Sequence, residues 1–226
     1  MTMHLLRDLD LLKREILSMG GLTEEAISNA ITAFVNRDTD LAKMVLAGED
    51  EIDRKEVDIA EECMKVLALH QPVASDLRFI VSVMMVNNDL ERIADLAANI
   101  AERALFLAGQ ASRITLPDAL TDMAGTVREM VTSSLDALVN QNEATARNVI
   151  VTDDVVDSTH RRLFETFHNL IRKTPESLDQ VIQILSISRY LERIGDHATN
   201  IAEEVIFMVS GEVIRHQPDA GERPRP

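Results

Sequence analysis

Paired carboxylates are the residues of this sequence whose type and spacing best suit chemistry. Four acidic pairs are separated by four positions, and they are Glu49/Asp53, Glu91/Asp95, Asp153/Asp157 and Glu192/Asp196. On a helix, residues four positions apart lie on one face, so both carboxylates of a pair can approach the same ion. Carboxylate oxygens are ligands for hard cations and for several transition metals. The spacing therefore makes all eight residues candidate metal ligands.

These carboxylates are predicted to face away from the apolar side of their helices. Counting about 100° per residue from Glu91, Asp95 falls at about 40° and Asn99 at about 80°, whereas the apolar positions centre at about 200–220°. The same pattern recurs around Asp196, with Asn200 one turn further on. We therefore expect outward clusters of oxygen donors, with Asn99 and Asn200 as supporting residues.

A second interpretation of the acidic pairs stays open at this point. A chain with 38 acidic residues can carry such pairs on a solvated acidic face without any ligand. Like charges at this spacing destabilise a helix slightly unless something neutralises them. Arg92 and Arg193 could neutralise the pairs in place of a metal. The recurrence of two pairs in each half of the chain is the observation that favours metal binding.

Other arrangements of reactive side chains carry less weight. Glu165 and His168 form the Glu-x-x-His unit that di-iron bundles use twice, but it occurs once here and is interpreted as surface. His197 directly follows Asp196 and is expected to face solvent or to pack, rather than to bind metal. The sequence contains no glycine-rich phosphate loop, Gly-x-Ser-x-Gly motif or Cys/His nucleophile pair. It therefore predicts no enzyme activity and no organic cofactor.

The elements that position these residues are predicted from prolines and periodicity. Pro72, Pro117 and Pro175 are the only prolines before the C-terminal tail, and Gly109 and Gly211 follow two helical stretches as helix-ending residues do. Apolar residues recur at three- and four-residue spacing, which is typical of antiparallel helix packing. Six helices are predicted, at 3–36, 39–69, 75–108, 117–141, 143–172 and 176–210.

The sequence also repeats itself. Residues 90–102 read LERIADLAANIAE and residues 191–203 read LERIGDHATNIAE, with ten identities in thirteen positions at an offset of 101. The second helix has a weaker counterpart in the fifth, at an offset of 104. We predict an all-α fold of two tandem three-helix bundles related by this repeat, formed by residues 1–109 and 112–211. The polar segment 212–226, with three prolines and a glycine, is expected to be disordered.

Composition narrows the functional classes. The 226 residues are 46% hydrophobic but only 3% aromatic, which favours helices over an all-β fold. A net charge of −15 argues against nucleic-acid binding, which depends on clustered Lys and Arg. The single cysteine, Cys63, excludes an intrachain disulfide and is expected to be buried. No apolar run approaches the ~20 residues of a spanning helix, so we expect a cytoplasmic protein that reaches a membrane only through partners.

Together these features resemble the PhoU family of phosphate-uptake regulators. The matching segments are Glu-Asp-Glu-Ile-Asp at 49–53, Leu-Glu-Arg-Ile-(Ala/Gly)-Asp at 90–95 and 191–196, and Asn-Ile-Ala-Glu at 99–102 and 200–203. The resemblance covers about residues 3–211. It implies two three-helix bundles packed side by side in a cytoplasmic protein that is usually a homodimer.

The resemblance also implies a function and a set of ligands. Such proteins work with the ATPase subunit of the phosphate ABC transporter and with its partner sensor histidine kinase. When phosphate is plentiful, they restrain uptake and hold the phosphate-starvation response off. The family motif (Glu/Asp)-x-x-x-Asp, where some members bind iron or zinc clusters, falls on the same eight carboxylates. Asp153 stands where the first copy has Glu49, and Val155 where it has Glu51, so the two sites are expected to differ.

The leading prediction is a non-enzymatic regulator that binds iron, zinc or manganese. The alternative is a carboxylate-type metal-dependent enzyme or a metal-storage bundle. These two classes differ in where the acids point, because di-metal enzymes and ferritin-like bundles hold their carboxylates inside the core. A third hypothesis is a PhoU-like protein that serves a transporter of another anion.

Overall fold

The predicted helices are present, with ends within two residues of their expected positions. The computed structural model describes residues 3–111 and 114–214, and its elements there are α1 (Met3–Asn36), α2 (Thr39–His70), α3 (Ala74–Ala108), α4 (Asp118–Asn140), α5 (Glu143–Lys173), the 3₁₀ helix η1 (Pro175–Ser177) and α6 (Leu178–Ser210). The expected sixth helix begins two residues later because Pro175 starts a 3₁₀ turn before the α-helix. Most of the segment predicted to be disordered, 215–226, lies outside the described residues.

Local chemistry explains where several helices begin and end. The side chain of Asp38 accepts hydrogen bonds from the backbone N–H groups of Asp40 and Leu41, both at 3.0 Å, and so caps the N-terminus of α2. Gly211 ends α6 in the left-handed conformation, with φ of 77°, and its N–H donates to the carbonyl of Phe207. Asp38 thus defines where α2 begins and Gly211 where α6 ends. Both helices carry candidate ligands.

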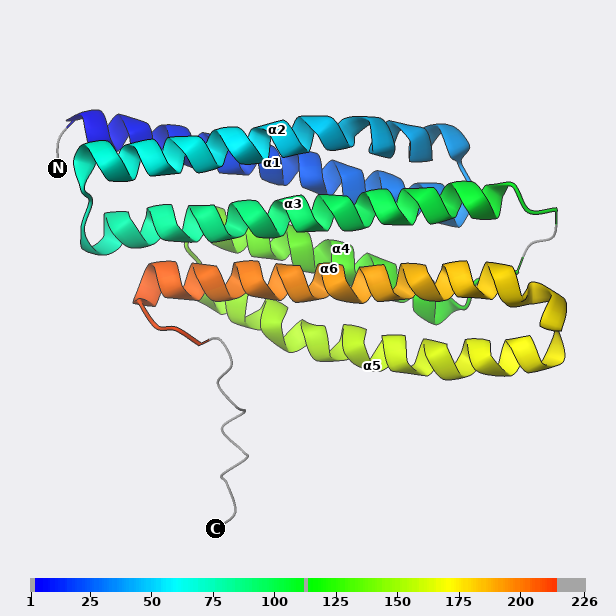
Figure 1. Cartoon of the computed structure of the whole chain (residues 1–226). Helices are drawn as coiled ribbons and strands as arrows, with labels where there is room; N and C mark the ends of the chain where they lie inside the picture. Colours follow the sequence, from blue (N-terminus) through cyan, green and yellow to red (C-terminus); the bar gives the residue numbers. More distant parts are fainter. Residues whose placement is uncertain (1–2, 112–113, 215–226) are drawn as a thin grey trace, which may run out of the picture.

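The helices form two layers (Figure 1). In the front layer α2, α3, α6 and α5 lie side by side, and α1 and α4 lie behind them. Helices α1, α2 and α3 contact one another, as do α4, α5 and α6, so each half of the chain is a three-helix bundle. The two bundles meet mainly where α3 packs along α6, with a smaller contact between α1 and α4. The predicted all-α tandem arrangement is confirmed.

Apolar side chains of both bundles join in one core. The residues that the repeat places in equivalent positions, Leu90 and Ile93 of α3 and Leu191 and Ile194 of α6, are fully buried. At the contact of α1 with α4, a Cβ added to Gly20 would lie 3.0 Å from the Leu135 side chain, so this glycine allows close packing. The boundaries at residues 109 and 112 stay a prediction, since apolar packing continues across them.

Two surface grooves show the internal repeat independently of α3 and α6. The first, of about 160 Å³, lies between α1 and α2 and is lined by Leu22, Glu25, Ala26, Asn29, Met44, Val45, Gly48, Glu51 and Ile52. The second, of about 180 Å³, lies between α4 and α5, and seven of its lining residues stand 104 positions after members of the first set. Equivalent helix pairs therefore pack with similar geometry in both bundles.

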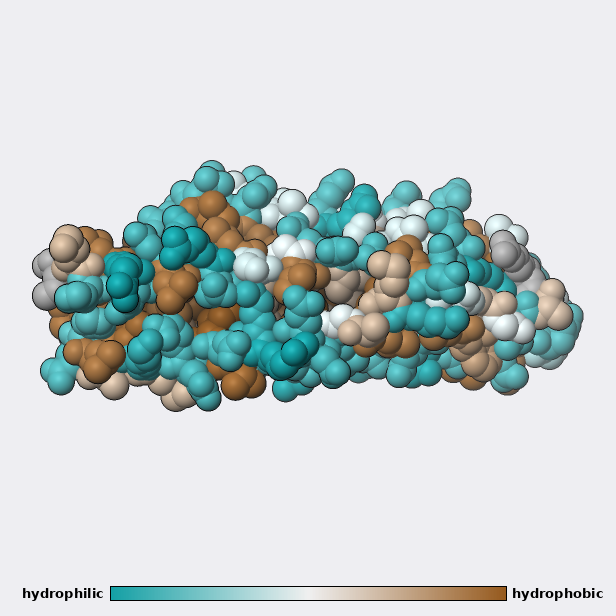
Figure 2. Space-filling view, turned by 90° about the horizontal axis from the view of Figure 1, so that it is seen from above, coloured by the Kyte–Doolittle hydropathy of each residue, from teal (hydrophilic) through white to brown (hydrophobic). Residues whose placement is uncertain are grey.

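The surface is mainly hydrophilic. Figure 2 shows polar residues over most of the face seen from above, interrupted by separate apolar patches. Exposed apolar side chains on α2 include Met44, Met64 and Leu69. Within residues 3–111 and 114–214, no helix combines the length and apolar character that crossing a membrane requires.

Candidate metal centres

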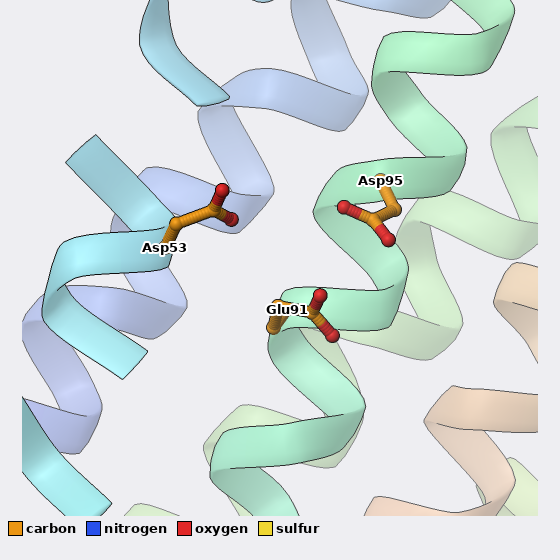
Figure 3. Close-up of side chains that lie close together, drawn as sticks. All are labelled: Asp53, Glu91 and Asp95. Carbon is orange, nitrogen blue, oxygen red and sulfur yellow. The ribbon is translucent and has the colours of Figure 1, made fainter. Parts of the chain in front are cut away.

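The first cluster of carboxylates joins α2 to α3. Asp53 of α2 and Glu91 and Asp95 of α3 each offer one oxygen, and these oxygens all lie within 4.8 Å of one another. Figure 3 shows Glu91 and Asp95 one turn apart on α3, with the Asp53 carboxylate reaching toward them from α2. Helical spacing places the α3 pair on one face, and the packing of α2 against α3 adds the third group.

Several negatively charged carboxylates lie close together in this cluster, and one arginine partly neutralises them. Burial, followed by the negative charge of Asp95, raises the pKa of Glu91. Burial also raises the pKa of Glu49, with Asp95 and Asp53 adding to the effect. Arg92 lies 3.3 Å from a Glu91 oxygen and 3.2 Å from an Asp95 oxygen, and is about half exposed. The arginine proposed as a neutralising group is therefore present at this cluster.

The second cluster joins α5 to α6. Oxygens of Asp153 and Asp157 on α5 and of Asp196 on α6 lie within 4.8 Å of one another. Burial, followed by the charges of Asp196 and Asp157, raises the pKa of Asp153 to about 7. The pKa of Asp196 is raised as well, first by partial burial and then by the negative charges of Glu192 and Asp157. Like charges held together in a partly desolvated site disfavour ionisation.

The two clusters differ in how far neighbouring groups neutralise or hydrogen-bond their carboxylates. Oδ1 of Asp153 is buried and has no hydrogen-bond partner. Arg193, the counterpart of Arg92, lies close enough to lower the pKa of Asp196 but forms no ion pair with any residue that the structure describes. The second cluster therefore holds a less compensated negative charge than the first.

The remaining predicted residues occupy the margins of the clusters. Glu49 and Glu192 are half-buried on the same helices, but they are outside the two groups of converging oxygens. The amide nitrogen of Asn99 donates to the backbone carbonyl of Asp95 at 2.7 Å. That of Asn200 donates instead to Oδ1 of Asp89 at 3.1 Å, between the two bundles. Neither amide nitrogen is directed at a carboxylate of the clusters.

One polar cluster was not predicted from the sequence. Nδ1 of His197 lies 2.8 Å from Oδ1 of Asp89, whose side chain is buried between α3 and α6. His197 therefore packs, as expected, but it does so as the hydrogen-bond partner of a buried acid. Two features of the sequence could have indicated this pair: Asp89 directly precedes the apolar Leu90, and His197 stands where the first copy has Leu96.

The residues of both clusters fit a bound cation. Each cluster offers three carboxylates, which suit hard divalent cations and also iron, zinc or manganese. The unpartnered Asp153 oxygen supports the fit, because a buried polar atom without a partner costs free energy that a cation would recover. None of the eight candidate carboxylates lies among the buried residues, whereas di-metal enzymes of bundle type hold their ligands in the core. Glu165 and His168, the separate Glu-x-x-His unit, are both exposed.

The fold and the site together define a class: an all-α protein of two tandem three-helix repeats with one surface cluster of carboxylates in each. The family model of the PhoU domain matches residues 16–104 and 120–205, one match in each bundle. The chain therefore belongs to the PhoU family, and the resemblance seen in the sequence is confirmed.

Individual relatives agree with this assignment. A protein described as a phosphate-specific transport system accessory protein PhoU homolog, from Pseudomonas putida, is 36% identical over 209 residues, covering 92% of this chain and 82% of the relative. The homolog from Aquifex aeolicus is 36% identical over 215 residues, which are 95% of this chain and 97% of the relative.

Solved structures of the family superpose on nearly the whole chain. The crystal structure of PhoU from Pseudomonas aeruginosa matches with a TM-score of 0.89 and 35% identity, over 91% of this chain and 99% of that one. The phosphate transport system regulatory protein PhoU from Streptococcus pneumoniae matches with a TM-score of 0.87 and 28% identity, over 93% and 99%.

Proposed function

We propose that this protein is a negative regulator of phosphate uptake and of the phosphate-starvation response. The observation that carries this proposal is the double match to the PhoU domain, together with relatives named as accessory proteins of phosphate transport. The two relatives match over 92–95% of this chain and 82–97% of their own length, so both bundles are shared rather than one. The protein acts when phosphate is plentiful, by restraining the transporter and keeping the starvation genes off.

The regulator acts through protein contacts rather than through catalysis. Its partners are the ATPase subunit of the phosphate ABC transporter and the sensor histidine kinase, in the cytoplasm, and it reaches the membrane only through them. The names of the relatives, which describe transport accessory or regulatory proteins, support a non-enzymatic role. Formation of a homodimer also belongs to this proposal.

In this proposal the regulator is an adaptor between its two partner proteins, and it binds metal ions at both carboxylate clusters. Asp53, Glu91 and Asp95 hold one ion or cluster, and Asp153, Asp157 and Asp196 hold the other, with Glu49 and Glu192 at the margins. When bound, iron, zinc or manganese supplies positive charge that neutralises the carboxylates and joins α2 to α3 and α5 to α6. The outward position of these acids favours this role over the alternative of an oxidase or storage bundle.

Deletion of the gene in its host tests the regulatory role. Starvation-gene expression and phosphate uptake should rise under phosphate-replete conditions and return to normal when the wild-type gene is supplied. Normal repression in the deletion strain would contradict the proposal. Derepression of genes for another anion, with phosphate genes unchanged, would favour a transporter of that anion instead. Titration of the purified ATPase subunit with the purified protein should show saturable binding if that subunit is the partner.

A further inference from the structure

We propose that Gly195 is the positioning residue that admits the Asp153 carboxylate to the second cluster, and that a side chain there would selectively disable that site. A Cβ added to Gly195 would lie 3.0 Å from Oδ1 of Asp153 and 3.6 Å from a methyl carbon of Val156. The first of these distances is shorter than ordinary van der Waals contact, so a larger residue at 195 requires the carboxylate to shift by a few tenths of an ångström. This inference rests on the proposed metal-binding role of the cluster.

The position of Asp153 itself indicates that the close approach serves a ligand. Its Oδ1 is buried and accepts no hydrogen bond, while Asp157 and Asp196 place further oxygens within 4.8 Å of the group. Holding a carboxylate oxygen away from water, beside other acids, costs free energy unless a positive group completes the site. A glycine inside a helix also costs stability relative to alanine. Both costs are recovered if the arrangement binds a cation.

The first repeat has different residues at both equivalent positions, and its equivalent acid is not part of the cluster. There Ala94 stands at the position of Gly195, and Glu49 stands at the position of Asp153. Glu49, opposite an alanine in the repeat, is not among the converging oxygens of its cluster, whereas Asp153, opposite a glycine, is a member of the other. The two repeats therefore differ at both positions, with Glu49 and Ala94 in the first and Asp153 and Gly195 in the second.

The consequence is a different donor arrangement at each site. The first cluster takes one carboxylate from α2 and two from α3, whereas the second takes two from α5 and one from α6. The missing Cβ at Gly195 is what makes room for the second α5 carboxylate. Gly195→Ala should therefore affect only the second site, and the reverse change in the first repeat, Ala94→Gly, should leave metal affinity within about twofold of wild type.

Calorimetric titration of the metal-free full-length protein with Mn²⁺ or Zn²⁺ tests the inference. To separate the sites, the first is disabled with Asp53→Asn and Asp95→Asn, and the second is then measured alone. In this background we expect Gly195→Ala to weaken binding at least tenfold. Adding Asp153→Glu, which reproduces the Ala94 and Glu49 pattern of the first repeat, should not restore the lost affinity, because Glu49 is not among the converging oxygens of the first cluster.

A further variant separates carboxylate positioning from packing. Combining Gly195→Ala with Asp153→Ala removes the steric conflict, so the melting temperature without metal should recover while the metal affinity stays low. Equal affinity of Gly195→Ala and its background protein would overturn this inference and leave the proposed metal sites intact. Absence of metal binding by the wild-type protein would overturn the metal-binding role and, with it, this inference.

Discussion

Nδ1 of His197 on α6 lies 2.8 Å from Oδ1 of Asp89 on α3, and this pair ties the two bundles together. Asp89 is only 5% exposed, and the amide of Asn200 donates to the same oxygen at 3.1 Å. In the repeat, Asp89 corresponds to Tyr190 and His197 to Leu96. The polar pair thus occurs once, and it makes the interface between the two similar bundles asymmetric.

Replacing His197 should destabilise this interface. His197→Leu leaves Asp89 buried with Asn200 as its remaining partner, which should lower the free energy of unfolding by about 1–3 kcal/mol. Urea denaturation followed by circular dichroism measures the change. In the double variant with Asp89→Leu, the buried carboxyl group is gone and part of the loss should return. An unchanged urea midpoint for His197→Leu would show that the pair contributes nothing to stability.

Metal should stabilise the folded protein. A cation that binds only the folded state at a concentration of about 100 times its Kd contributes about 2.7 kcal/mol. For a chain of this size, that free energy corresponds to a rise in melting temperature of about 5–10 °C. We expect manganese, iron or zinc to produce this rise, and Asp95→Ala combined with Asp196→Ala to abolish most of it.

The Asp95 and Asp196 double variant should still fold, because neither carboxylate takes part in the apolar core. Its melting temperature in a chelator therefore serves as the control for the metal experiment. If the wild-type protein shows no metal-dependent shift and retains no metal on purification, the acidic pairs are a solvated surface.

Without metal, stability should decrease as the pH rises toward neutrality. Burial and neighbouring acids raise the pKa of Asp153 from 3.8 to about 7, so the folded protein holds a proton that the unfolded chain has already lost. The stability from this proton is complete below about pH 3.8 and is lost as the pH rises through about 7. Thermal melts in a chelator between these pH values should show the decline.

Asp153→Asn is the matched control for that pH dependence. The amide cannot ionise, so the variant should show a shallower decline and, at pH 8 without metal, melt about 2–4 °C higher for each kcal/mol of repulsion removed. A decline equally steep in the variant would assign the pH dependence to other groups.

The two arginines beside the clusters should behave differently. Arg92 forms ion pairs with Glu91 and Asp95, and its removal would leave the first cluster more negative. Arg92→Ala should therefore strengthen metal binding at the first site, by about 1.5- to fivefold, since exposed pairs are worth about 0.2–1 kcal/mol. Arg193→Ala, the equivalent change in the second repeat, should have a smaller effect. Calorimetric titration of both variants measures the difference. If Arg92→Ala only lowers stability, with metal affinity unchanged, then Arg92 is the neutralising group of a solvated face.

The sequence by itself determined the helices, the repeat and the direction of the acids. These features depend on local chemistry, since Pro72, Pro117 and Pro175 interrupt helices wherever they occur. Helical geometry likewise places Glu91 and Asp95 on one face, whatever the rest of the fold does. The segment LERIGDHATNIAE at 191–203 carried both the repeat and the family resemblance.

Only the tertiary structure decided which of these acids meet. Whether Asp53 approaches Glu91 depends on the rotation and spacing of α2 against α3, which the packing of the apolar core sets. The burial of Asp153 depends in the same way on how closely α5 approaches α6 at Gly195. The pairing of Asp89 with His197 joins residues 108 positions apart. Such contacts result from the simultaneous packing of several helices, so no periodicity within a single helix can predict them.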